Sequence, residues 1–103
     1  MRTREKSYKD YGLNDNEIEY IKEFCINANT ENQKMIIEIA LSELSPYIEK
    51  ICLEILIYGK SYDDLCKEEY LYIGKGDFYG YRRKGMAAIK RWMILHNIWE
   101  EQQ

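Results

Sequence analysis

The basic side chains near the C-terminal end of the sequence are the residues best suited to act on a charged partner. Residues 73–99 contain six lysine or arginine residues and one acidic residue, Asp77. Residues 1–72 contain nine basic and 15 acidic residues, so the net charge of −3 conceals a local excess of positive charge. A segment of this kind has a field of the sign that attracts phosphate groups, and it favours a nucleic-acid partner.

A helix-turn-helix at about 61–92 is the arrangement that would present these charges. Ser61 predicts the start of a short helix that continues to about Tyr70. The Ile-Gly-Lys-Gly segment at 73–76 predicts a tight turn, and a long helix is expected over about 77–99. In such a motif the shorter helix braces the longer one, and the start of the longer helix enters the major groove of DNA.

A helical wheel with about 100° per residue divides the long helix into two faces. The face predicted to be buried carries Phe78, Tyr81, Gly85, Met86, Ile89, Trp92 and Met93. The face predicted to be exposed carries Tyr79, Gly80, Arg83, Lys84, Ala87 and Arg91. Arg82 falls beside the apolar face, where it is expected to pair with Asp63 or Glu68 as readily as with a phosphate.

Base contacts come mostly from the start of a recognition helix, which predicts a role for residues near the turn. Gly76 leaves backbone N–H groups open to a phosphate. Gly80 costs about 1 kcal/mol of helix propensity, which is easier to understand if DNA must approach there. The expected groove contacts are Lys75, Asp77, Tyr79 and Arg83, and the expected phosphate contacts are Lys84, Lys90 and Arg91, with Arg82 beside them.

The segment 70–86 resembles the end of the small phage late-gene transcriptional regulators of the ArpU and RinA types. The aromatic pair Phe78-Tyr79 and the basic cluster at 82–84 match the pattern of that family, and the segment 55–65 resembles its bracing helix. The resemblance implies a helix-turn-helix similar to region 4 of sigma factors. It also implies a sequence-specific, DNA-binding transcriptional regulator of a phage or integrated mobile element.

The rest of the chain predicts further helices, so the expected fold is all-α, a compact bundle of about five helices. Residues 1–13 are expected to form an N-terminal arm, and 14–103 a single domain. Capping residues predict helices over about 15–27, 31–44 and 46–58. Met35, Ile36, Ile39 and Ala40 are the expected core stripe of the second helix. The third is apolar nearly all round and is predicted to be the centre of the domain.

Several classes of protein are not expected. The three cysteines, Cys25, Cys52 and Cys66, have no short C-x-x-C spacing and are predicted to be buried, reduced thiols. His96 is the single histidine, so neither a metal site nor a cofactor is expected. No nucleophile lies beside a base and no glycine-rich phosphate loop is present, so the protein is not expected to be an enzyme. The absence of a long apolar run predicts a cytoplasmic protein without membrane contact.

The end of the long helix predicts a protein partner. Ile94, Leu95, Ile98 and Trp99 form an apolar patch that must be covered by the first helix or by another chain. A homodimer is expected, or contact with RNA polymerase or a recombinase. Two alternatives remain open from the sequence: a recombination directionality or excision accessory factor that binds DNA, and a protein-binding adaptor such as a sigma-factor antagonist.

Overall fold

The structure, a computed structural model, describes residues 5–101. These residues contain five α-helices, one short 3-10 helix and no β-strand, which confirms the predicted all-α class. In chain order the elements are η2 (Lys9–Tyr11), α1 (Asp15–Ile26), α2 (Glu31–Leu41), α3 (Pro46–Tyr58), α4 (Tyr62–Glu68) and α5 (Lys75–Leu95).

The helix starts lie where capping residues predict them. A side chain before each of the first four α-helices accepts a hydrogen bond from a backbone N–H in the first turn, which satisfies a donor that has no intrahelical partner. Gly59 ends α3 with φ of 71°, a left-handed conformation that favours glycine. The capping residues are Asn14 with Glu17, Thr30 with Gln33, Ser45 before Pro46, and Ser61 with Asp64.

The helix ends differ from the sequence-based boundaries. α2 ends at Leu41 instead of Leu44, and α4 ends at Glu68 instead of Tyr70. The predicted turn at 73–76 is shifted, because α5 begins at Lys75. The last helix was expected to reach Trp99 but ends at Leu95, where Asn97 adopts φ of 59° and the chain reverses.

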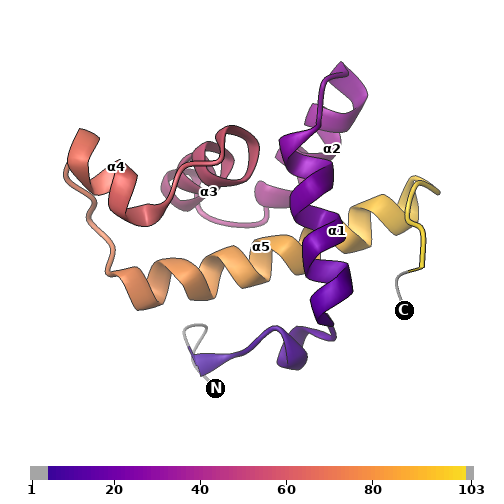
Figure 1. The fold of residues 1–103 in the computed structure, drawn as a ribbon, viewed down its shortest axis with the longest axis horizontal. Helices are drawn as coiled ribbons and strands as arrows, with labels where there is room; N and C mark the ends of the chain where they lie inside the picture. The colour runs from indigo at the N-terminus through magenta and orange to yellow at the C-terminus, as the bar shows by residue number, and fades with distance from the viewer. Residues whose placement is uncertain (1–4, 102–103) are drawn as a thin grey trace.

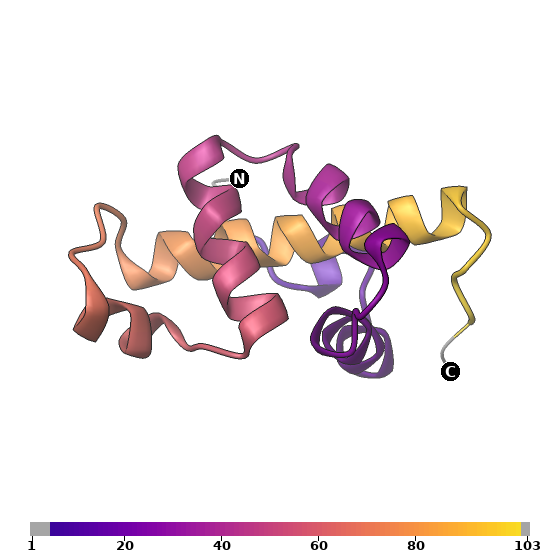
Figure 2. The ribbon, with the colours of Figure 1, turned by 90° about the horizontal axis from the view of Figure 1, so that it is seen from above.

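α5 is the central element of the fold, whereas the sequence predicted α3 in that position. It packs against α1, α2, α3 and η2. It lies along the length of the molecule in both Figure 1 and Figure 2, with α1 and α3 crossing it. A helix of 21 residues is about 31 Å long, which is most of the 38 Å longest dimension. A helix with neighbours on several sides has more than one buried face.

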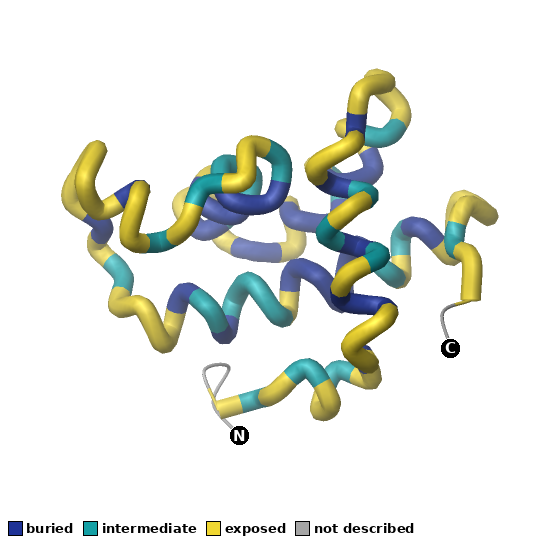
Figure 3. The backbone as a smooth tube through the Cα atoms, in the orientation of Figure 1, coloured by how far each residue is buried: buried dark blue, intermediate teal, exposed yellow. Residues whose placement is uncertain are grey.

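The closest approach in the core is between α2 and α5. A Cβ added at Gly85 would lie 2.7 Å from Leu41 Cδ2, so this contact requires glycine. Two positions of α2 were assigned wrongly: Met35 is 43% exposed, whereas Ile37 is fully buried. The buried residues concentrate in the middle of α5 and on the faces of the helices around it (Figure 3).

The N-terminal segment is part of the domain and does not project as an arm. Leu13 belongs to the core, and Tyr8 Oη donates to Met86 Sδ of α5 at 3.4 Å. The segment passes alongside α5 in Figure 1, and η2 contacts that helix. Residues 1–4 of the predicted arm, and the last two residues of the predicted domain, lie outside the described residues.

Two of the three cysteines are buried as predicted. Cys25 and Cys52 are fully buried, and burial raises the pKa of each thiol to about 12. Cys66 is exposed, contrary to the prediction, because only Leu65 of α4 points into the core. Between residues 5 and 101, no three or more His, Cys, Asp or Glu side chains are placed to hold a metal ion. None of the helices in this range combines the length and apolarity needed to cross a membrane.

Candidate nucleic-acid interface

The first turn of α5 is exposed and open to close approach. The helix begins at Lys75 after Gly74, which makes no side-chain capping hydrogen bond. Lys75, Gly76 and Asp77 are exposed, and a Cβ added at Gly74 or Gly76 would have no atom within 4 Å. The first N–H groups of a helix lack intrahelical partners and carry partial positive charge. This end of α5 therefore has the groups that receive a phosphate.

Side chains hold α4 to the start of α5, without close packing of the two helix backbones. Tyr62 Oη donates to the carbonyl oxygen of Ile73 at 2.6 Å, and the Tyr62 ring lies 5.7 Å from the Phe78 ring. Lys75 Nζ lies 3.2 Å from Asp63 Oδ2. These contacts fix the short helix relative to the basic one, as a bracing helix would be fixed.

The outer face of α5 is narrower than the helical wheel predicted. Lys84 and Arg91 are exposed as expected. Gly80 and Ala87 were assigned to the same face, but both are buried. The wheel assumed one buried face, whereas α5 has neighbours on several sides. Gly80 is therefore not a surface for DNA, and its helix-propensity cost is not explained by a DNA contact.

Tyr79 is half-buried, although it was predicted to be exposed. Its ring centroid lies 5.4 Å from that of Phe78 and 6.4 Å from that of Tyr62. The side chain packs against the edge of the core and helps to position α4. It is a structural residue in this conformation, and only part of its ring is accessible.

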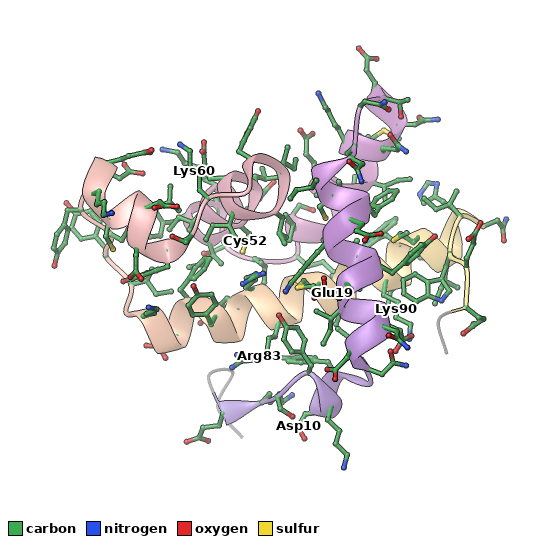
Figure 4. All side chains as sticks on the ribbon, viewed as in Figure 1. Asp10, Glu19, Cys52, Lys60, Arg83 and Lys90 are labelled. Carbon is green, nitrogen blue, oxygen red and sulfur yellow. The ribbon has the colours of Figure 1, made fainter. Side chains whose placement is uncertain are left out.

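Arg83 holds the N-terminal segment against α5. Its Nε donates to the carbonyl oxygen of Lys6 at 2.7 Å, and its guanidinium lies 6.0 Å from the centre of the Tyr8 ring. Figure 4 shows this side chain between α5 and the N-terminal segment. The prediction that Arg83 contacts a base edge does not agree with this geometry, because the side chain is held by Lys6 and Tyr8. The N-terminal segment was not expected to fold back onto α5.

Lys90 is committed to an internal ion pair and is not placed for phosphate binding. Its Nζ donates to Glu17 Oε2, and the two side chains are 24% and 8% exposed. Burial opposes the ionisation of Glu17, but hydrogen bonds from Lys90 and from the Asn14 N–H hold its pKa below the usual value. Lys90 also lies over the ring of Trp99 at 5.2 Å.

Arg91 and Lys75 form ion pairs that remain accessible to solvent. Arg91 pairs with Glu43, which also accepts from Trp92 Nε1 at 2.9 Å. The side chains of Arg91 and Lys75 are 57% and 54% exposed. Ion pairs at this exposure contribute about 0–1 kcal/mol, so either cation can exchange its carboxylate for a phosphate at small cost.

Arg82 pairs with no carboxylate in the part of the chain that the structure describes. It was expected to pair with Asp63 or Glu68, but Asp63 pairs with Lys75 and Glu68 pairs with Lys60. The Nε of Arg82 is buried and makes no hydrogen bond within the described part of the chain. The guanidinium lies 5.6 Å from the centre of the Tyr79 ring.

The apolar C-terminal end is covered in part by the chain itself. Trp99 folds back, and its ring makes an edge contact with Tyr20 of α1 at 5.1 Å. Ile94, Leu95 and Ile98 remain 48%, 68% and 37% exposed. Ile94 and Leu95 line a shallow hollow of about 410 Å³ together with the Arg91–Glu43 pair.

Two features of this surface were missed. The first is Glu17, which precedes Ile21 by four positions and therefore lies on the buried side of α1. The second feature is a set of exposed tyrosines around the α4–α5 link. Their rings contact one another edge to face, and no periodic pattern signals them because they come from two separate segments: Tyr47, Tyr70 and Tyr72.

Comparisons with protein-family models, with curated proteins and with solved structures found no match.

Proposed function

We propose that the protein binds double-stranded DNA through α4 and α5, used as a helix-turn-helix. The observation that carries the proposal is the exposed, basic outer side of a helix whose first turn is open to close approach. The short helix before it is fixed by the Tyr62 contacts, as the motif requires. The protein acts in this proposal as a transcriptional regulator of a phage or integrated element, in keeping with the resemblance of residues 70–86.

The cations that support the proposal are three of those that the sequence predicted. Lys84 is exposed and has no ion pair with any residue from 5 to 101, and Lys75 and Arg91 have only exposed, weak pairs. Lys90 is excluded by its pair with Glu17. The proposed contacts are therefore the first turn of α5 for the groove, and Lys75, Lys84 and Arg91 for phosphates.

Asp77 lies in the first turn of α5 and is exposed. A carboxylate there suits the positive end of the helix dipole, and it repels phosphate unless it accepts a hydrogen bond from a base. Carboxylates accept from the N4 amino group of cytosine in the major groove. We therefore propose that Asp77 selects cytosine in the bound site.

The partner in this proposal is a second copy of the chain. One helix-turn-helix contacts few base pairs, and two copies on half-sites about one turn apart supply the specificity of most such regulators. Ile94 and Leu95 are large apolar side chains left exposed, as expected for such a contact. Sedimentation of wild type and of Leu95→Glu measures the oligomeric state. We expect the wild type to be a dimer and the variant to be a monomer.

The direct test of DNA binding is fluorescence anisotropy with a labelled duplex over a series of salt concentrations. Each phosphate contact contributes about −0.9 to the slope of log K against log salt. Lys84→Ala is expected to lower affinity about fivefold and to reduce the slope by about 1. Lys34→Ala removes an exposed lysine from the first turn of α2 and serves as the matched control. A salt-independent affinity, or equal effects of the two substitutions, would contradict the proposal.

The exposed tyrosines favour a second function, a protein-binding adaptor. Tyr70 and Tyr72 are 76% and 82% exposed, and tyrosine is enriched at the energetically dominant positions of protein interfaces. Under this alternative α5 faces an acidic protein, and the tyrosines anchor it. Affinity for duplex would then be absent, and Tyr72→Ala would abolish recovery of a protein partner.

A further inference from the structure

A pocket of about 280 Å³ lies between α1, α3 and α5, beside the link from α3 to α4. Its apolar wall is formed by Ile26, Ile55 and Leu56, and its polar side by Tyr79 and Arg82 of α5. Ile26 is 57% exposed, so more than half of an apolar side chain at the rim is left uncovered. The pocket is separate from the proposed DNA-contacting side of α5 and does not depend on that proposal.

Arg82 is the group in this pocket that needs a partner. Its Nε is buried without a hydrogen bond within the described residues, and none of the ion pairs found between residues 5 and 101 includes Arg82. A guanidinium stays charged at any physiological pH, and a buried donor without a partner destabilises the folded protein. The Tyr79 ring at 5.6 Å offsets part of that cost through its π face. An anion in the pocket would supply a counter-charge for the guanidinium, which lines the pocket.

The surrounding charges select the kind of anion. Lys60 also lines the pocket, but its Nζ lies 3.2 Å from Glu54 Oε2 and 3.0 Å from Glu68 Oε2. The two negative charges outweigh the single positive charge of Lys60. Lys22 is held 3.5 Å from Glu19 at the rim. A dianion such as phosphate would therefore be repelled by the carboxylates of Glu54 and Glu68. Of the described residues that line the pocket, Arg82 would be the one cation left to bind it. A monoanion is favoured.

We propose that this pocket binds a small monocarboxylate with an apolar body. The planar guanidinium of Arg82 matches a carboxylate, which can accept two of its N–H groups. The apolar part of the ligand would cover Ile26 and pack against Ile55 and Leu56. The volume lies just below the roughly 300–1,000 Å³ of sites for drug-sized ligands, so the ligand is a short chain or a single ring.

The test uses octanoate as the probe, below its micelle concentration, with octanol and inorganic phosphate as comparisons. Calorimetry measures affinity, and amide NMR spectra of the full chain locate the site. Octanoate is expected to shift the amides of Ile55, Gly59, Tyr79 and Arg82, and to bind at least about tenfold more tightly than octanol. Inorganic phosphate is expected to produce none of these shifts.

The variant Arg82→Met keeps the length of the side chain and removes its charge, so it is expected to weaken octanoate at least about tenfold and to leave octanol unchanged. Lys34→Met makes the same charge change at an exposed position of α2, outside the pocket, and should bind octanoate as wild type does. If Arg82→Met does not fold, the wild-type comparison of octanoate with octanol decides. Equal binding of octanoate and octanol, shifts elsewhere, or phosphate binding in place of octanoate would overturn the proposal.

Discussion

Both halves of α5 carry lysine residues, but the lysines differ in their burial and in their intramolecular partners. Near the C-terminal end, Lys90 is tied to the buried carboxylate of Glu17 and covered by Trp99. In the first half of the helix, Lys75 and Lys84 are exposed, and Lys75 has only a solvent-accessible partner. The difference shows that an excess of basic residues in a segment does not define a binding surface. Burial and the intramolecular partner decide which cations can reach a phosphate.

Breaking the Glu17–Lys90 pair is the substitution with the largest expected effect. Glu17→Ala leaves Lys90 without its partner and the Asn14 N–H without an acceptor. We expect the free energy of unfolding to fall by about 2 kcal/mol, less than the roughly 3–5 kcal/mol for a fully buried pair, because Lys90 is partly exposed. Chemical denaturation measures this loss. A fall of less than about 0.5 kcal/mol in the free energy of unfolding would contradict the structural role assigned to the Glu17–Lys90 pair.

Glycine substitutions in the two halves of α5 should have effects of opposite sign. Gly85→Ala places a Cβ 2.7 Å from Leu41 Cδ2 and 3.3 Å from Leu44 Cδ1. The overpacking outweighs the gain in helix propensity, and we expect a net loss of about 1 kcal/mol. Gly76→Ala has open space around it and should raise stability by up to about 0.5 kcal/mol. Thermal unfolding of both variants distinguishes the packed position of Gly85 from the open position of Gly76, and stabilisation by Gly85→Ala would contradict this difference.

The pH dependence of stability should report the same buried pair. The pKa of Glu17 is lowered in the folded protein, so its contribution is present above the unfolded pKa and is lost as pH falls through the folded value. We expect part of the loss in stability on acidification to disappear in Glu17→Gln. Asp10 and Asp64 also have lowered pKa values, from hydrogen bonds donated by Ser7 and Ser61, so some loss persists. Parallel acid-unfolding curves for wild type and Glu17→Gln would show that the pair does not contribute.

The exposed pair between Arg91 and Glu43 is expected to have only a weak effect on stability. Glu43→Gln removes the carboxylate that holds Arg91, and it should change the free energy of unfolding by less than about 1 kcal/mol. The same substitution leaves Arg91 available for a phosphate, so affinity for duplex should rise slightly. Anisotropy measures the second change. A fall in affinity would show that Arg91 does not contact DNA.

The helix starts could be predicted because they depend on local chemistry. Asn14, Thr30, Ser45 and Ser61 each satisfy a backbone donor within their own turn, so the signal lies in a few adjacent residues. The end of the last helix depends on packing far away in sequence. Trp99 turns back onto Tyr20 of α1, and no pattern within 77–99 contains that contact.

The candidate site was predicted less well than the fold, for the same reason. A helical wheel describes one helix in isolation and assumes that it has one buried face. It placed Gly80 and Ala87 outside, whereas α5 packs against other elements on several sides. Arg83 was expected to face solvent, but Lys6 and Tyr8 of the N-terminal segment lie against it. The fold-back of that segment is a long-range feature with no local signal.

The most direct test of the proposed interface is an amide NMR titration of the full chain with a short duplex. If the exposed half of α5 binds DNA, the largest shifts will occur at Lys75, Gly76 and Asp77, and the amide of Lys90 will change little. Shifts centred on Lys90, shifts confined to Tyr70 and Tyr72, or no shifts at all would contradict that account.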